Sequence, residues 1–198
     1  MTRTVRTVLS FGLIVLALWF YNAVRPVPQP PGILAPDAPQ IEPVAGKPEV
    51  FERNEHVLTA LARFSGQARV LSVDRYGDRA SKVAPLDVAL GWGPMSDSAT
   101  LKVVDVAQTE RGLVFQSFDP KLPDEQVRDY VLNLHVVAAD PELEKRLSEL
   151  RRGNVVRMEG WLVEVVAGEG WRWRGKTREA APKMPGTLLW LHTLEVVS

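Results

Sequence analysis

The chain contains no cysteine in its 198 residues. That absence excludes disulfide bonds, thiolate nucleophiles and cysteine-ligated metal sites. Net charge is absent too, because 24 basic residues balance 24 acidic ones. A neutral chain differs from highly basic nucleic-acid-binding proteins and from acidic solvating tails. A folded domain of this chain must therefore be held by its apolar core alone, which is feasible with 45% hydrophobic residues.

Several catalytic signatures are missing as well. The sequence has no phosphate-binding glycine loop, no HExxH zinc motif and no EF-hand loop. No nucleophile, base and orienting group can be placed together from their spacing. We therefore expect no cofactor and no metal, and we favour a binding or scaffold protein over an enzyme.

The N-terminus carries a long apolar run. Arg3 and Arg6 precede residues 8–24, VLSFGLIVLALWFYNAV. As a helix this run is roughly 25 Å long, just enough to span the hydrocarbon layer, and Trp19 and Tyr21 suit the membrane interface. We expect an uncleaved single-pass anchor in the inner membrane, with residues 1–7 cytoplasmic and the domain periplasmic. The alternative is a cleaved signal peptide, which would need small residues where this run has bulky ones.

Prolines crowd the segment that follows, residues 25–48, which holds eight of the fifteen in the chain. Such spacing is incompatible with a helix or a central strand. An extended proline-rich segment rises about 3.1 Å per residue. We predict a semi-rigid spacer that holds the domain up to roughly 70 Å from the bilayer. A proline-rich ligand for a recognition domain is the alternative.

Residues 49–198 read as one extracytoplasmic domain of mainly β (α+β) class. Apolar alternation and branched residues predict strands at 66–76, near 88–90, and at 101–107, 113–118, 130–138, 154–166 and 187–197. Helical spacing predicts one helix from about residue 48 to 64 and another over 140–152. The second helix has Asp140 as N-cap, Pro141 in its first turn and a leucine seam on one side.

The strand at 154–166 organises the predicted domain. Val156 and Met158 share one face, but after Gly160 the apolar positions change phase to Val163 and Val165. A phase change at a glycine is typical of a bulge or a sharp bend, and a bent strand can join both halves of a small barrel. The preceding helix and the pattern G-x-V-V-R-x-x-G-x-L resemble OB-fold barrels. We predict a small OB-like barrel with a capping helix, preceded by one transmembrane helix.

Two aromatic stretches are candidate ligand-binding surfaces. Trp92 lies between Gly91 and Gly93, in a corner that either plugs the core or presents the ring to a ligand. The second stretch interleaves aromatic and basic residues: Trp171, Arg172, Trp173, Arg174 and Lys176. Such residues can stack on bases or sugars and pair with anions. The alternative is that the tryptophans are buried and the arginines lie at the surface.

A weaker candidate for catalysis combines Asp97, Asn133 and His135. Period two along a strand places Asn133 and His135 on the same face. A histidine can act as general base while an acidic residue orients it. Asp97 is also well placed to cap a short helix over residues 98–103, and His135 can equally be a hydrogen-bonded structural residue.

Some motifs are similar to those of a known family. The stretches LGWGPMSD (90–97) and GWRWR (170–174), Asn133–Leu134–His135 and the segment from Val156 to Glu164 resemble an uncharacterised bacterial family of membrane-anchored proteins. The similarity covers most of the domain from about Gly66. Members of that family tend to carry a cysteine near the C-terminus, whereas this chain has no cysteine. The layout is also similar to periplasmic OB-like haem chaperones, but their C-terminal histidine motif is not visible.

We therefore expect a membrane-anchored binding or scaffold module of the bacterial cell envelope, with an envelope protein as partner. One alternative is a hydrolase that uses Asp97, Asn133 and His135. Another is an OB-like domain that binds oligonucleotides or glycans. The neutral charge and the extracytoplasmic location argue against nucleic acid.

Overall fold

The computed structural model describes residues 25–166, 172–174 and 184–198, so the predicted membrane span at 8–24 lies outside the described residues. Within them, no helix is both long enough and apolar enough to cross a bilayer.

The described chain is mainly β, which confirms the predicted fold class. Its strands are β1 (Gln40–Pro43), β2 (Val50–Arg53), β3 (His56–Arg75), β4 (Leu86–Gly91), β5 (Val104–Thr109), β6 (Gly112–Ser117), β7 (Val131–Ala138), β8 (Val155–Val166), β9 (Arg172–Arg174), β10 (Met184–Pro185) and β11 (Thr187–Val196). Its helices are η1 (Arg79–Lys82), η2 (Gly93–Ser96), η3 (Thr100–Lys102), α2 (Asp124–Val127), η4 (Arg128–Tyr130) and α3 (Pro141–Ser148).

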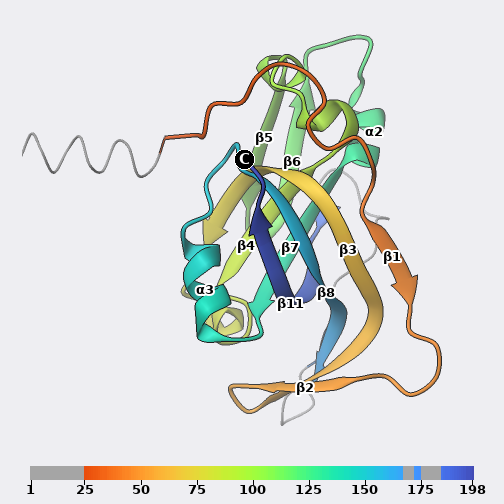
Figure 1. The fold of residues 1–198 in the computed structure, drawn as a ribbon, viewed down its shortest axis with the longest axis vertical. Coiled ribbons are helices and arrows are strands. Elements are labelled where there is room, and N and C mark those ends of the chain that lie inside the picture. The colour runs from red at the N-terminus through yellow and green to blue at the C-terminus, as the bar shows by residue number, and fades with distance from the viewer. Residues whose placement is uncertain (1–24, 167–171, 175–183) are drawn as a thin grey trace, which may run out of the picture.

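Five strands close on one another and form a ring (Figure 1). The order is β3–β4–β7–β11–β8, and β8 pairs again with β3. Neighbours are antiparallel except β7 and β11, which run parallel. Side chains that point into the ring make the main core, among them Phe64, Val70, Val88, Leu134, Met158 and Leu189. A second sheet, β10–β6–β5, packs over the outer face of β4 and β7 through Leu113, Val131 and their neighbours.

Helix α3 joins β7 to β8 and caps the ring, as predicted. The side chain of Asp140 accepts a hydrogen bond from the backbone N–H of Leu143 at 2.9 Å, and Pro141 opens the first turn. The leucine seam, Leu143, Leu147 and Leu150, is buried in the main core. Because one face of the helix closes one end of the ring, the apolar interior is shielded from solvent.

The irregularity predicted at Gly160 of β8 lies instead in the strands that pair with β8. Strand β8 runs without interruption, and the register shifts lie in its partners, between Ala60 and Ala62 of β3 and between Leu191 and Thr193 of β11. The apolar phase changes because the two ends of β8 bury opposite faces. Val156 and Met158 point into the ring, whereas Val163 and Val165 pack outside it in a third apolar cluster.

The prediction of a helix from about residue 48 to 64 is wrong. This stretch is the hairpin of β2 and β3, whose turn residues Asn54 and Glu55 have φ angles of 48° and 63°. Phe51 stacks on Trp190 at 4.8 Å between ring centroids. The spacing that suggested a helix therefore reflects burial of alternate residues in a twisted hairpin, where strand pairing overrides local pattern.

The proline-rich segment is not a free spacer. Residues 25–43, which we call the strap, lie along the folded domain and end in β1, paired with β3 (Figure 1). Val27 N–H donates to the carbonyl of Arg152 at 2.8 Å, and Ala35 is fully buried. The strap forms no helix, as its proline spacing predicts, but the residues that hold it come from distant parts of the chain. The expected reach of the spacer therefore does not apply.

Candidate functional site

A buried acid–imidazole pair lies on the outer face of β4 and β7. Asp87 and His135 are directly opposite in the register of the two strands. His135 Nδ1 lies 2.8 Å from Asp87 Oδ1, and the two residues are 3% and 0% exposed. A carboxylate oxygen only accepts, so the imidazole Nδ1–H donates and the ring is held in one tautomer and orientation.

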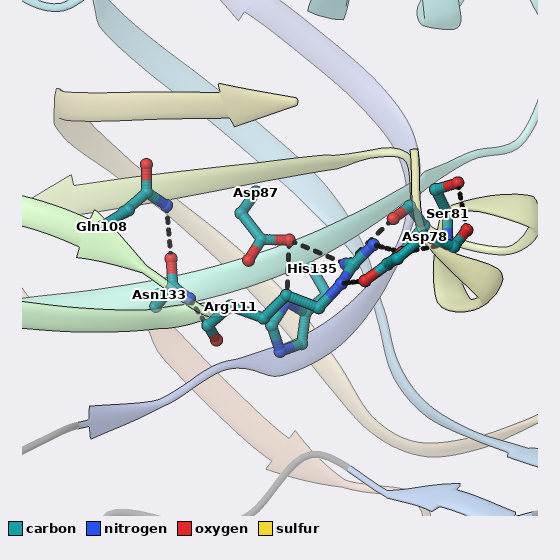
Figure 2. A network of polar contacts seen from close by, with 8 residues as sticks. Asp78, Ser81, Asp87, Gln108, Arg111, Asn133 and His135 are labelled. Carbon is teal, nitrogen blue, oxygen red and sulfur yellow. Dashed lines mark hydrogen bonds and ion pairs between the residues drawn. The ribbon is translucent and has the colours of Figure 1, made fainter. Parts of the chain in front are cut away.

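Arg111 reaches this pair from the β5–β6 hairpin. The turn residues Glu110 and Arg111 have φ angles of 46° and 59°, a conformation that is costly for side chains other than glycine and asparagine. The guanidinium grips Asp78 with two hydrogen bonds, Nη2 to Oδ1 at 2.7 Å and Nε to Oδ2 at 2.8 Å. Nη1 lies 3.4 Å from Asp87 Oδ1 (Figure 2). Arg111 therefore links a surface carboxylate to a buried one.

Aromatic rings enclose the network. The ring of Trp173 lies 4.9 Å from the His135 ring, and the Arg111 guanidinium lies 5.4 Å from Trp173 and 4.2 Å from Tyr76. The backbone of Gly186 packs so tightly on the His135 imidazole that a Cβ there would overlap Nε2. Within the described part of the chain, no hydroxyl hydrogen-bonds to Nε2, so there the imidazole has an orienting acid but no nucleophile beside it.

Asn133 lies two residues from His135 on the same face of β7. Its Oδ1 accepts from Gln108 Nε2 at 2.7 Å, and its Nδ2 donates to the backbone carbonyl of Arg111 at 3.3 Å. The structure thus brings Asn133 and His135 into one network, through the β5–β6 hairpin (Figure 2).

Charge is distributed unevenly in this network. Hydrogen bonding to Arg111 lowers the pKa of Asp78. Burial, and then the nearby Asp87, raises the pKa of both Asp74 and Tyr76. Asp87 Oδ2 is buried and has no hydrogen-bond partner among the described residues. An acceptor left in this state is costly, which makes Arg111 and His135 the groups that hold the Asp87 carboxylate in place.

Asp97, the third predicted catalytic residue, belongs to a different network. Its Oδ1 accepts from the backbone N–H of Gly32 at 2.8 Å and of Ala99 at 2.9 Å. These two amides, Ala99 first, lower the pKa of Asp97. Ser96 acts beside it, since its Oγ accepts from the N–H groups of Leu34 and Ala35. Asp97 therefore binds the strap and does not orient His135.

The predicted aromatic surface is only partly described. Trp92 is 5% exposed, so its side chain is not presented to solvent, and its backbone N–H donates to the carbonyl of Tyr130. Gly93 has a φ of 52°, and its missing Cβ makes room for the Tyr130 ring. Trp171 and Lys176 lie outside the described residues. Arg172 and Arg174 lie on β9, with their backbones opposite Val166 and Glu164 of β8.

Sequence reasoning missed Asp87 and Arg111. The signal for Asp87 is a carboxylate within the apolar run Leu86–Gly91, all of which is buried, because a buried charge requires a partner. Arg111 carries no comparable signal, since an arginine in a polar turn is ordinary. Among the described residues, no cluster of His, Asp and Glu can hold a metal ion.

Comparison of the chain with protein-family models, with curated proteins and with solved structures finds no match. The resemblance drawn from residues 90–97 and 170–174 therefore stays a prediction.

Proposed function

We propose that the protein is a membrane-anchored, extracytoplasmic scaffold module of the bacterial envelope, built on an OB-like barrel. The ring order and the position of α3, between the third and fourth ring strands, support the OB-like assignment. The apolar run at residues 8–24 supports the anchor.

The face that OB-like barrels use for ligands is already filled. Those barrels bind oligonucleotides and oligosaccharides on their second and third strands and the flanking loops, which correspond here to β4 and β7. On that face Asp87, Asn133 and His135 are buried under the β5–β6 hairpin and Trp173. This occlusion argues against an oligonucleotide or glycan ligand there. The separation of Asp97 from His135 argues against the proposed hydrolytic trio.

An apolar surface is open elsewhere, on the sheet that extends β3 and β8 beyond the ring. Ile41, Val50 and Val57 are 49%, 56% and 42% exposed. Their cross-strand partners place them on one face. Val50 lies opposite Thr59, two residues from Val57, which lies opposite Val166 and Glu52. Ile41 lies opposite Phe64, which lies opposite Gly160 on the same face of β8 as Val166. We call these three residues the extension face. Figure 1 shows β2 projecting at the end of the molecule away from the C-terminus.

The edge beside the extension face suits an added strand. Among the described residues, β1 and β2 pair only with β3, so within that part of the chain their outer backbone edges are open. Exposed Glu49, Glu52 and Glu55 make the β2 edge acidic, while Arg53 is neutralised by an ion pair with Glu144 at 2.7 Å. The extension face is the observation that carries the proposal, and its partner is an extended protein segment with alternating apolar and basic residues.

The experiment is site-specific photocrosslinking in native membranes with the full-length protein. A crosslinker at Val50 or Val57 is expected to yield the same partner, crosslinked through an extended apolar and basic segment. The charge reversals Glu49→Lys and Glu52→Lys together should abolish that product without changing the unfolding midpoint. Phe118, which is 60% exposed on a different part of the surface, is the matched control position.

Three results would overturn the proposal. One is the absence of a product from Val50 and Val57. Another is an equal yield of the same product from Phe118. The third is a yield that the charge reversal leaves unchanged, because complementary charge should contribute to recognition.

A further inference from the structure

The motif at residues 90–98 acts as the receptor for the strap. Gly93 N–H donates to the Ala35 carbonyl at 2.7 Å, and Ser98 Oγ donates to the carbonyl of Gln29 at 3.1 Å. Arg69, which is 7% exposed, stabilises this receptor, because its Nη1 donates to Ser96 O at 3.1 Å and to Ser98 Oγ at 2.9 Å. Together with the bonds from Ser96 and Asp97, these contacts fix the strap along its length.

Two glycines make room for the strap. A Cβ on Gly153 would overlap the carbonyl of Val27, and a Cβ on Gly66 would lie 2.8 Å from the Cα of Pro39. Gly153 also has a φ of 99°, which glycine adopts readily. The strap is therefore seated close to the domain backbone at both of its ends, and the seat is built from positions far apart in the sequence.

The attachment places the domain near the end of the apolar run. The run ends at Val24, and Val27 is already hydrogen-bonded to Arg152. Three residues span at most about 10 Å even when fully extended. The turn that holds Arg151, Arg152 and Gly153 is thus within about that distance of the end of the run.

Basic side chains gather at this point. Arg25 and Arg152 are exposed, and Arg151 is half-buried on the same turn. Burial, and then the charge of Arg152, lowers the pKa of Arg69, while Asp97 raises it, so the charge of Arg152 reaches the residue that supports the strap receptor. Exposed arginines next to a membrane span can pair with anionic phospholipid headgroups.

We propose that the strap holds the domain directly against the bilayer, with Arg25, Arg151 and Arg152 in contact with anionic phospholipid headgroups and the extension face directed away from the membrane. Figure 1 shows the start of the strap and the β2 hairpin toward opposite ends of the molecule. This inference rests on the anchor in the proposed function, and it replaces the predicted semi-rigid spacer with a domain held in a fixed orientation at the membrane.

The test uses full-length protein reconstituted into vesicles, and it exploits the absence of cysteine. A single fluorophore is attached at Glu149→Cys, near Arg151, or at Glu52→Cys in β2; both positions are exposed. The vesicles contain phosphatidylcholine and phosphatidylglycerol with a quencher on the lipid headgroup. We expect severalfold stronger quenching at position 149 than at position 52. Equal quenching at the two positions would overturn the fixed orientation.

Charge is tested by a second comparison. In vesicles of phosphatidylcholine alone, or with Arg151→Gln and Arg152→Gln, quenching at position 149 should fall while the anchor keeps the protein on the vesicles. Quenching that is the same in both lipid mixtures and in both proteins would overturn the headgroup contact. Protein that fails to float with the vesicles would instead overturn the anchor, which separates failure of the proposed function from failure of this inference.

Discussion

His135 Nδ1 lies 2.8 Å from Asp87 Oδ1, across two neighbouring strands and out of contact with solvent. The pair has the geometry in which an acid orients an imidazole, yet Gly186 and Trp173 cover the ring. A polar pair placed there positions the β5–β6 hairpin and β9 on the ring, because Arg111 of the hairpin contacts Asp87 and Trp173 of β9 contacts His135. Its first measurable role is thus in stability.

Replacement of Asp87 by alanine is expected to destabilise the domain by about 1–3 kcal/mol, because the buried Nδ1–H of His135 loses its acceptor. Urea unfolding followed by circular dichroism measures the change. Asp105→Ala, at an exposed position of β5, is the control and should stay within about 0.5 kcal/mol of the parent protein. A loss below about 1 kcal/mol for Asp87→Ala would contradict the structural role of the pair.

Arg111→Lys should behave as a disruptive substitution. Lysine cannot reproduce the forked contact with Asp78 or the planar contacts with Tyr76 and Trp173. We expect a loss of about 1–3 kcal/mol in unfolding free energy. Arg79→Lys, at an exposed position nearby, should change little. If the two substitutions have the same small effect, the network is not held by Arg111.

Gly153→Ala should loosen the strap. The added Cβ meets the backbone of Val27, and the φ of 99° is unfavourable for alanine. We expect a loss of about 1–3 kcal/mol and faster proteolytic cleavage within residues 25–39, located by mass spectrometry. Gly77→Ala is a matched control, because a Cβ there meets nothing within 4 Å. Protection of the strap that Gly153→Ala leaves unchanged would refute the tight seat.

Asp97 should contribute to acid sensitivity. The Ala99 and Gly32 amides hold its pKa below the ordinary value of 3.8. A lowered folded-state pKa contributes stability above the unfolded pKa, and this contribution is lost as pH falls toward the folded value. Asp97→Asn should therefore flatten the decline in unfolding free energy between about pH 5 and pH 2. A decline of unchanged slope, measured by urea titrations across that range, would show that the strap contact has no part in it.

Elements with strong local signals were predictable. Helix α3 is predictable because Asp140, Pro141 and three spaced leucines, all within a few residues of one another, each indicate a helix. Strand β7 is predictable because it is a short run rich in branched apolar residues. In both cases the sequence pattern and the tertiary contacts favour the same structure.

The β2–β3 hairpin shows the limit of this reasoning. Its turn residues, Asn54 and Glu55, lack the glycine that usually reveals a turn with positive φ. Pairing of β3 with β8, on residues more than ninety positions away, decides its conformation. The prediction of a free spacer at residues 25–43 was wrong for a related reason. Ser96 and Asp97 become its binding partners only after the chain has folded back on itself.

Only part of the candidate site could be predicted from the sequence. Asn133 and His135 share a face through strand periodicity alone, so their proximity could be anticipated. Asp87 joins them by the register of β4 and β7, and Arg111 by the path of a hairpin. Register and hairpin direction depend on which strands pair, and a single sequence does not state this.

The position of the strap has a consequence for how the chain matures. Synthesis proceeds from the N-terminus, so residues 25–39 emerge before the rest of the domain, yet Val27 must wait for Arg152 before its hydrogen bond can form. Contacts of such large sequence separation form slowly, and during translation the domain is assembled around a segment that has no seat until most of the chain has appeared. The earliest part of the domain to be made is then among the last to be secured, which leaves an interval in which chaperones and proteases have access to an extended proline-rich segment.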